Sequence, residues 1–146
     1  MKKSYIVVME NKKREREIKF RAWLLDEKRM VAVDVIHFNY PHDGTICSIT
    51  YIDGVQTELH SGDDCILRQY TGLKDKNGVE IYEGDIFQFH YNDGPGGMGV
   101  VFWHDEMAAY MWHPTDHDES MSTLMPEYQA MGVIGNIYEN PDRLDK

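Results

Sequence analysis

The sequence predicts a mostly β fold of the α+β class, in which a small mixed unit precedes a β-sandwich or β-barrel. Two observations lead to this prediction. Short stretches alternate apolar and polar residues with the period of a half-buried strand, and Gly, Pro, Asn and Asp separate these stretches at regular intervals. Stretches with the apolar spacing of an amphipathic helix are scarce.

The first two strands are predicted from residue 18 onward. Residues 11–17 (NKKRERE) carry charges without an apolar face, so a tail or a short solvated helix end is expected there. Ile18 to Leu24 alternates as a half-buried strand does, and residues 26–29 (DEKR) form a polar turn. Met30 to Phe38 is rich in β-branched and aromatic residues, which predicts the partner strand of a hairpin.

A second hairpin is predicted after the break at residues 41–44 (PHDG). Residues 45–52 (TICSITYI) are predicted to form a strand, and Asp53-Gly54 is a two-residue turn signal. Residues 55–60 are predicted to form the returning strand of the hairpin. Residues 61–64 (SGDD) either end the sheet or cap a short helix that starts near Cys65.

The stretch from Gln69 to Ile86 (QYTGLKDKNGVEIYEGDI) contains the strongest short hairpin signal, Asn77-Gly78. We expect Val79, Ile81 and Ile86 to be buried. The charged neighbours are expected to stay in solvent: Lys74, Asp75, Lys76, Glu80 and Glu83. The segment is therefore interpreted as scaffold rather than as a site.

The remaining strands are predicted on both sides of a glycine-rich stretch. Residues 86–91 (IFQFHY) form a strand, residues 92–99 (NDGPGGMG) a flexible hairpin loop, and residues 100–103 and 108–113 two further strands. Residues 113–126 are expected to form an acidic loop. Residues 129–138 (QAMGVIGNIY) form a closing strand, in which Gly132 and Gly135 indicate a bulge or a tight barrel corner.

Composition and charge limit the function classes. The 146 residues carry a net charge of −10, yet the first 30 residues hold ten basic and five acidic side chains, which leaves −15 for residues 31–146. A negative body repels nucleic acid, so only the basic tail is suited to contact it. No apolar run approaches the roughly 20 residues of a membrane span, and no cleavable signal is recognisable, which predicts a cytoplasmic protein. Met1 and Met9 are both candidate start residues.

Two groups of side chains are candidates for metal or redox chemistry. His104, His113 and His117, beside Asp116 and Asp118, supply nitrogen and oxygen donors that suit zinc or iron. Pro114 disfavours a helix that would aim His113 and His117 together, so a solvated acidic loop is the favoured interpretation. Cys47 and Cys65 form no CxxC motif and are expected to be reduced and partly buried.

The other constellations are predicted to be structural. The carboxylates of Asp75, Glu80, Glu83 and Asp85 lie in a turn-rich segment that promises no burial, so acid–base catalysis is not favoured. Residues 94–99 (GPGGMG) lack the Gly-Lys-Ser/Thr and the helix of a P-loop. Aromatic residues stack on bases only beside a cationic groove, so those in this chain are expected in the core or in protein contacts. No catalytic residue and no cofactor is predicted.

Three segments resemble the YopX family of phage and prophage proteins: residues 16–23, residues 69–85 and residues 135–141. The resemblance spans about residues 16–142 and implies an N-terminal α+β subdomain over 17–76 and a C-terminal SH3-like β-barrel over 77–142. The charged residues ahead of it are expected to form a flexible basic tail over 1–16. It implies an unknown biochemical function and no catalytic residues. The residues of the family motif are assigned structural roles: Tyr70, Thr71, Gly72, Asn77, Gly78, Gly84, Asp85, Gly135 and Asn136.

The favoured function is that of a protein-interaction module in a phage or prophage accessory protein. An exposed edge strand is a template for pairing, so the partner is a host or phage protein or a second copy, and a homo-oligomer is expected. The alternative is a nucleic-acid-binding protein that uses Lys12 to Arg21. A metal-dependent enzyme built on His104, His113 and His117 is the weakest of the three.

Overall fold

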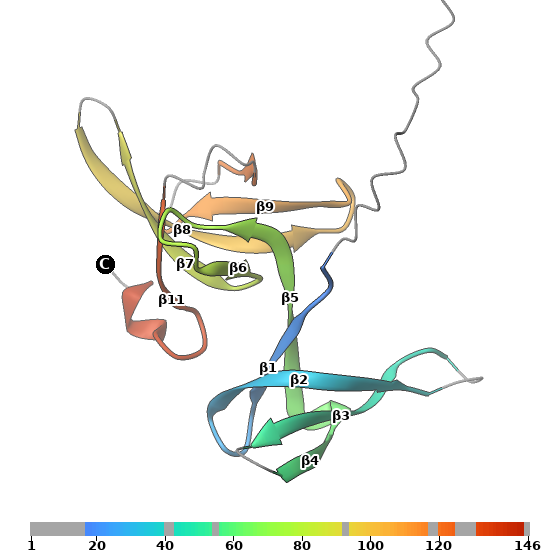
Figure 1. Cartoon of the computed structure of the whole chain (residues 1–146). Helices are drawn as coiled ribbons and strands as arrows, with labels where there is room; N and C mark the ends of the chain where they lie inside the picture. The colour runs from blue at the N-terminus through green and yellow to red at the C-terminus, as the bar shows by residue number, and fades with distance from the viewer. Residues whose placement is uncertain are drawn as a thin grey trace, which may run out of the picture.

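The structure, a computed structural model, describes residues 17–39, 43–53, 56–91, 94–116, 120–124 and 131–144. These residues form two antiparallel sheets and two short 3-10 helices, Gly62–Asp64 and Pro141–Arg143 (Figure 1). The strands are β1 (Phe20–Leu24), β2 (Arg29–Phe38), β3 (Ile46–Asp53), β4 (Gln56–Ser61), β5 (Cys65–Lys74), β6 (Glu80–Tyr82), β7 (Asp85–Tyr91), β8 (Gly94–His104), β9 (Ala109–Pro114), β10 (Ser122–Thr123) and β11 (Gly132–Asn136). The predicted mostly β fold is confirmed.

The first sheet has the strand order β4-β3-β2-β1-β5-β6. Its first two hairpins are those predicted: β1 pairs with β2 across the turn at residues 25–28, and β3 pairs with β4. One face of the sheet buries a cluster because alternate residues of each strand point to the same side. The buried members of this cluster are Ala22, Leu24, Val31, Ile49 and Tyr51.

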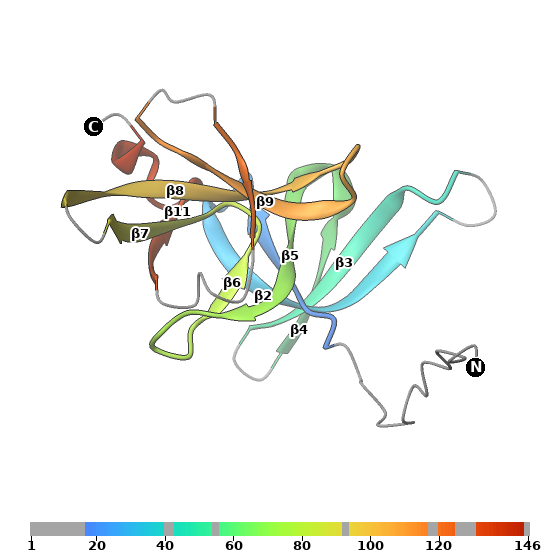
Figure 2. The ribbon, with the colours of Figure 1, turned by 90° about the horizontal axis from the view of Figure 1, so that it is seen from above.

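Strand β5 was not predicted. Ser61 caps the 3-10 helix through a hydrogen bond from the Asp63 N–H, but the helix ends before Cys65, where β5 begins. The first half of β5 pairs with β1 and the second half with β6, so this strand leads from one group of strands to the other (Figures 1 and 2). Arg68 at its centre is only 1% exposed. The charged Arg68 breaks the apolar pattern from which a buried strand is predicted. Its burial depends on an ionic partner that is distant in the sequence.

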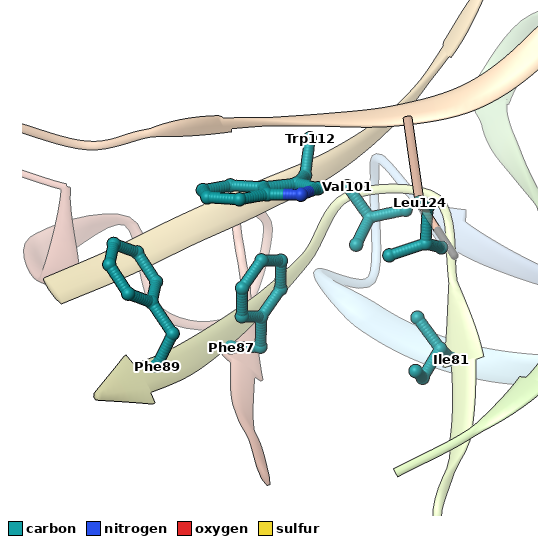
Figure 3. Close-up of a cluster of buried hydrophobic side chains, with 6 residues drawn as sticks. All are labelled: Ile81, Phe87, Phe89, Val101, Trp112 and Leu124. Atoms are coloured by element: carbon teal, nitrogen blue, oxygen red, sulfur yellow. The ribbon is translucent and has the colours of Figure 1, made fainter. Parts of the chain in front are cut away.

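The second sheet has the order β10-β9-β8-β7-β11 and its own core (Figure 3). The core side chains are Ile81, Phe87, Phe89, Val101, Trp112 and Leu124. The predicted loop at 92–99 is wrong from Gly94 onward, because these residues belong to β8 and pair with β7. The glycines serve packing: a Cβ on Gly99 would lie 2.7 Å from the Trp112 ring and 2.8 Å from the Phe87 ring.

The closing strand β11 carries the predicted irregularity. Its register against β7 shifts between Val133 and Gly135, as expected for a bulge. The described part of residues 17–76 contains strands and a single 3-10 helix, and the second sheet does not close into a barrel. The α+β character of the first unit and the SH3-like barrel are therefore not confirmed. No helix within the described residues has the length and hydrophobicity of a transmembrane span.

The two sheets meet at an arginine–carboxylate pair as well as through apolar contacts, since Ile81 of β6 packs in the core of the second sheet. The Arg68 guanidinium on β5 donates to the carboxylate of Asp85, the first residue of β7, and also to the backbone carbonyl of Glu83. Asp85 accepts a second hydrogen bond, 2.8 Å long, from the Tyr82 N–H. Trp23 of β1 stacks on Tyr138 with ring centroids 6.1 Å apart, so residues near the C-terminus join the same junction.

Replacing Arg68 by Ala is expected to lower the free energy of unfolding by about 3–5 kcal/mol, because Asp85 would remain buried without its cation. Urea denaturation measures the change. The matched control is Arg29→Ala, which removes an exposed pair with Glu27 and Asp53 and should change stability little. Equal effects of the two substitutions would contradict the structural role of the buried pair.

Replacing Gly84 by Ala is expected to destabilise the protein more than replacing Gly72. Both glycines have positive φ, +77° and +90°, so each substitution costs about 1–2 kcal/mol of backbone strain. At Gly84 the new Cβ would also lie 3.1 Å from the Tyr138 ring, whereas nothing lies within 4 Å at Gly72. Thermal unfolding of the two variants gives the comparison, and equal losses would exclude a packing role for Gly84.

Candidate functional site: the cleft between β1 and β2

A pocket of about 470 Å³ opens where β1 and β2 separate. The two strands pair only from Arg21 opposite Ala32 to Leu24 opposite Arg29. Beyond this point β1 stays beside β5, while the far half of β2 diverges with β3 (Figures 1 and 2). Apolar and charged side chains share the walls of the pocket: Ile18, Lys19, Phe20, Arg21, Ala32, Val33, Asp34, Ile36, Glu80 and Tyr82.

The far half of β2, residues 33–38 (VDVIHF), has one free edge. These residues pair with β3 on one side, and no strand of the described residues pairs with them on the β1 side. Phe38 is 59% exposed and Val35 is 44% exposed, which is high for large apolar side chains in a strand. We call residues 33–38 the free β2 edge.

Tyr82 forms the floor of the cleft. Its side chain is 3% exposed, its hydroxyl donates a 2.8 Å hydrogen bond to Glu80, and its ring lies 5.6 Å from that of Tyr70. Burial and the bond to Glu80 raise the pKa of Tyr82 to about 12. The Arg21 guanidinium lies over this ring at 4.4 Å, a cation–π contact. The phenol is thus a fixed, neutral platform for Arg21.

Lys19 and Glu80 form the charged wall on the β6 side. The Lys19 ammonium contacts Glu80 at 2.5 Å and Glu17 at 2.8 Å. The hydrogen bond from Lys19 lowers the pKa of Glu80. Partial burial acts in the opposite direction, and the hydrogen bond from Tyr82 lowers the pKa further. Glu80 is therefore ionised at neutral pH while Tyr82 is protonated, and neither group changes its charge near pH 7. Such a pair suits binding better than proton transfer.

The predicted histidine candidates are not assembled into a metal site in the described part of the chain. His104 and His113 flank Phe102 on β8 and β9, with ring centroids 6.1 Å and 5.5 Å from it. His117 lies outside the described residues, and these contain no group of three metal-ligating side chains. Cys47 and Cys65 are both free thiols; Cys47 is exposed and Cys65 is half-buried.

The prediction that the acids of residues 75–85 remain solvated is wrong for Asp75. Its side chain is buried and accepts three backbone hydrogen bonds, from Asn77 (2.7 Å), Val79 (2.9 Å) and Val133 (2.9 Å). Asp75 thereby ties the Asn77-Gly78 turn to β11. Val79, expected to be buried, is 44% exposed, whereas Ile81 and Ile86 are buried as predicted. The Asn-Gly hairpin itself is confirmed by the pairing of β5 with β6.

Asp85, the other buried acid of this segment, faces Arg68. Burial raises the pKa of the Asp85 carboxyl, although the Arg68 charge and the Tyr82 N–H act in the opposite direction. Glu80 and Glu83 are half-buried rather than solvated. The acids thus divide by role: Asp75 and Asp85 hold the backbone, while Glu80 lines the cleft.

The sequence analysis did not identify the cleft residues Arg21, Glu80 and Tyr82 as a group. Part of the signal was present, because the alternation of Ile18 to Leu24 places Lys19, Arg21 and Trp23 on one face of the strand. Nothing in the sequence indicates that this face meets Tyr82, about sixty residues later, since that contact depends on β5 lying beside β1. The residues 12–16 of the predicted nucleic-acid contact lie outside the described residues.

Acidification is expected to remove the contribution of Asp75 to stability. Burial alone would raise the pKa of Asp75, but the backbone donors Val133, Val79 and Asn77 outweigh it and lower the pKa. A lowered pKa in the folded state stabilises the fold above the unfolded value, about 3.9, and this stabilisation is lost as the pH falls through the folded value.

Asp75→Asn should therefore cost about 1–3 kcal/mol near pH 7, because the amide presents a donor to a backbone N–H. The cost should shrink at about pH 3. Urea denaturation of wild type and variant at both pH values measures it. If wild type and variant differ in unfolding free energy by the same amount at both pH values, the charge of Asp75 does not contribute to stability.

The family model described as YopX protein matches residues 19–145. Among solved structures, the chain is similar to that of protein EF1440 from Enterococcus faecalis, with 28% sequence identity and a TM-score of 0.59 over 88% of this chain and 98% of that chain. No curated protein matches it. The family resemblance seen in the sequence is confirmed.

Proposed function

This chain belongs to the YopX protein family, and from this premise we propose that it is a phage or prophage accessory protein that acts by binding another protein, not as an enzyme. The single observation that carries the proposal is the free β2 edge, which borders an open pocket. A cytoplasmic location is part of the proposal. The predicted SH3-like topology of the C-terminal unit remains an expectation, and the proposed function does not depend on it.

The proposed mode of binding is strand addition. An extended segment of the partner pairs its backbone with residues 33–38, and its side chains enter the pocket beside Phe20 and Ile36. Lys, Pro, other charged side chains and bulges protect edge strands. This edge contains no Lys or Pro, although it holds Asp34 and its register against β3 shifts at two places. Its exposed apolar side chains, Val35 and Phe38, would be covered by the added strand.

A second copy of the chain is one possible source of that segment, because two free edges can pair in an antiparallel manner. Residues 31–146 carry a net charge of −15, which repels the phosphates of nucleic acid and disfavours a nucleic-acid partner. Light scattering across a concentration series distinguishes self-association from binding of a different protein.

Phe38→Lys is expected to weaken partner binding about tenfold or more, because it replaces an apolar cross-strand neighbour of the added strand by a lysine, which protects edge strands from pairing. The matched control is Ile52→Lys: Ile52 is 58% exposed in the same sheet, but it belongs to β3, which pairs with strands on both sides. Pull-down from host lysate and light scattering are compared for wild type and the two variants.

The expected result is that at least one bound protein, or the self-associated species, is lost with Phe38→Lys and kept with Ile52→Lys. An identical set of bound proteins for all three forms would overturn the assignment of the binding edge. Circular dichroism confirms that both variants keep the β fold.

A further inference from the structure

We infer that the segment added to the free β2 edge carries a carboxylate, which binds the Arg21 guanidinium in the cleft. The carboxylate is that of an Asp or Glu side chain of the partner segment, and recognition of a C-terminus instead is a separate outcome of the test. This inference rests on the proposed function and adds to it the chemistry of the partner. It is carried by the position of Arg21, by its lack of an ion pair among the described residues, and by the opposite charges of Arg21 on β1 and Asp34 on β2.

Arg21 is held in a fixed position at the cleft. Its guanidinium stacks at 4.4 Å on the ring of Tyr82, and that ring is itself held by the hydrogen bond to Glu80 and by contact with Tyr70. Stacking occupies the face of a guanidinium and leaves its N–H groups at the edge available for hydrogen bonds. A carboxylate can accept two of these in parallel, which gives both affinity and orientation.

The neighbouring cations differ from Arg21 because each already has an anionic partner. Lys19 pairs with Glu17 and Glu80. Arg29 pairs with Glu27 and Asp53, and Arg68 pairs with Asp85. Within the described residues, Arg21 makes no ion pair, although it is half-buried and lines the pocket. A half-buried guanidinium gains most from a partner that also excludes water.

Glu80, the acid beside Tyr82 in the cleft, is already engaged. Its Oε1 accepts from Lys19 and its Oε2 accepts from Tyr82, so both oxygens have donors. No described carboxylate forms an ion pair with Arg21, whose charge also opposes the burial that raises the pKa of Asp85, so the added segment supplies the anion that pairs with it. Asp34 also lines the pocket, from the β2 side, and makes no ion pair there. An acid on the added segment is repelled by Asp34 and attracted by Arg21, which places it on the β1 side.

A library of random peptides displayed on phage tests the inference without knowledge of the natural partner. The immobilised full chain is screened as wild type, Arg21→Gln, Arg21→Lys, Phe38→Lys and Ile52→Lys. Wild type and Ile52→Lys are expected to enrich peptides in which an acidic residue adjoins β-branched or aromatic residues. Enriched peptides are resynthesised with Glu replaced by Gln, and with a free or an amidated C-terminus, so that the two sources of carboxylate are distinguished.

The affinity of an acidic peptide should fall about tenfold or more with Arg21→Gln, since a charge-assisted hydrogen bond is lost. Arg21→Lys should fall between wild type and Arg21→Gln, because it keeps the charge but not the paired donors. The Glu-to-Gln peptide should bind wild type and Arg21→Gln equally weakly, a result that a merely structural role of Arg21 would not give.

Two negative outcomes are distinguishable. Peptides that bind without any carboxylate, and lose binding with Phe38→Lys but not with Arg21→Gln, would overturn the inference and leave the binding edge in place. If wild type enriches no peptide above background, or if Phe38→Lys enriches the same peptides, both the inference and the proposed binding edge are wrong.

Discussion

The buried ion pair between Arg68 and Asp85 determines how the two sheets of this protein meet. Burying two charges is costly, and a pair of apolar side chains would often be at least as stable. An ion pair is more directional than apolar packing, because the N–H groups of Arg68 point at acceptors in fixed positions, one of them the Met30 sulfur. Arg68 also reaches both the Asp85 carboxylate and the Glu83 carbonyl. The start of β7 is thereby fixed against the centre of β5.

The same hairpin that supplies Asp85 also builds the cleft. Asp75 fastens its turn to β11, Asp85 fastens its end to β5, and the short strand between them presents Glu80 and Tyr82 to β1. The segment that resembles its family most closely is thus scaffold at its two ends and part of a candidate site in the middle. Because both ends are held by buried carboxylates, Tyr82 has little freedom to move, and Arg21 on its ring is oriented before any partner arrives.

The sequence predicted the elements whose information is local. The hairpins around residues 25–28 and at Asn77-Gly78, and the bulge in β11, depend on turn residues and alternation within a few positions. Three features depend on contacts distant in the chain and were missed. Arg68 interrupts the apolar pattern of β5 in the sequence, Gly97 and Gly99 of β8 lie against aromatic rings, and Asp75 accepts a hydrogen bond from the distant Val133. The cleft belongs with these, since Arg21 and Tyr82 meet only through β5.

The charge of the protein and the chemistry of the cleft act at different distances. A net charge of −10 repels acidic partners at long range, so the protein does not gather them by electrostatic steering. Arg21 acts only at contact, where water is excluded and its attraction is least screened. In the proposed mode of binding, a partner first pairs with the free β2 edge beside Phe38, and its carboxylate then reaches Arg21. In this order the backbone and apolar contacts supply the affinity, and Arg21 selects among the strands that fit.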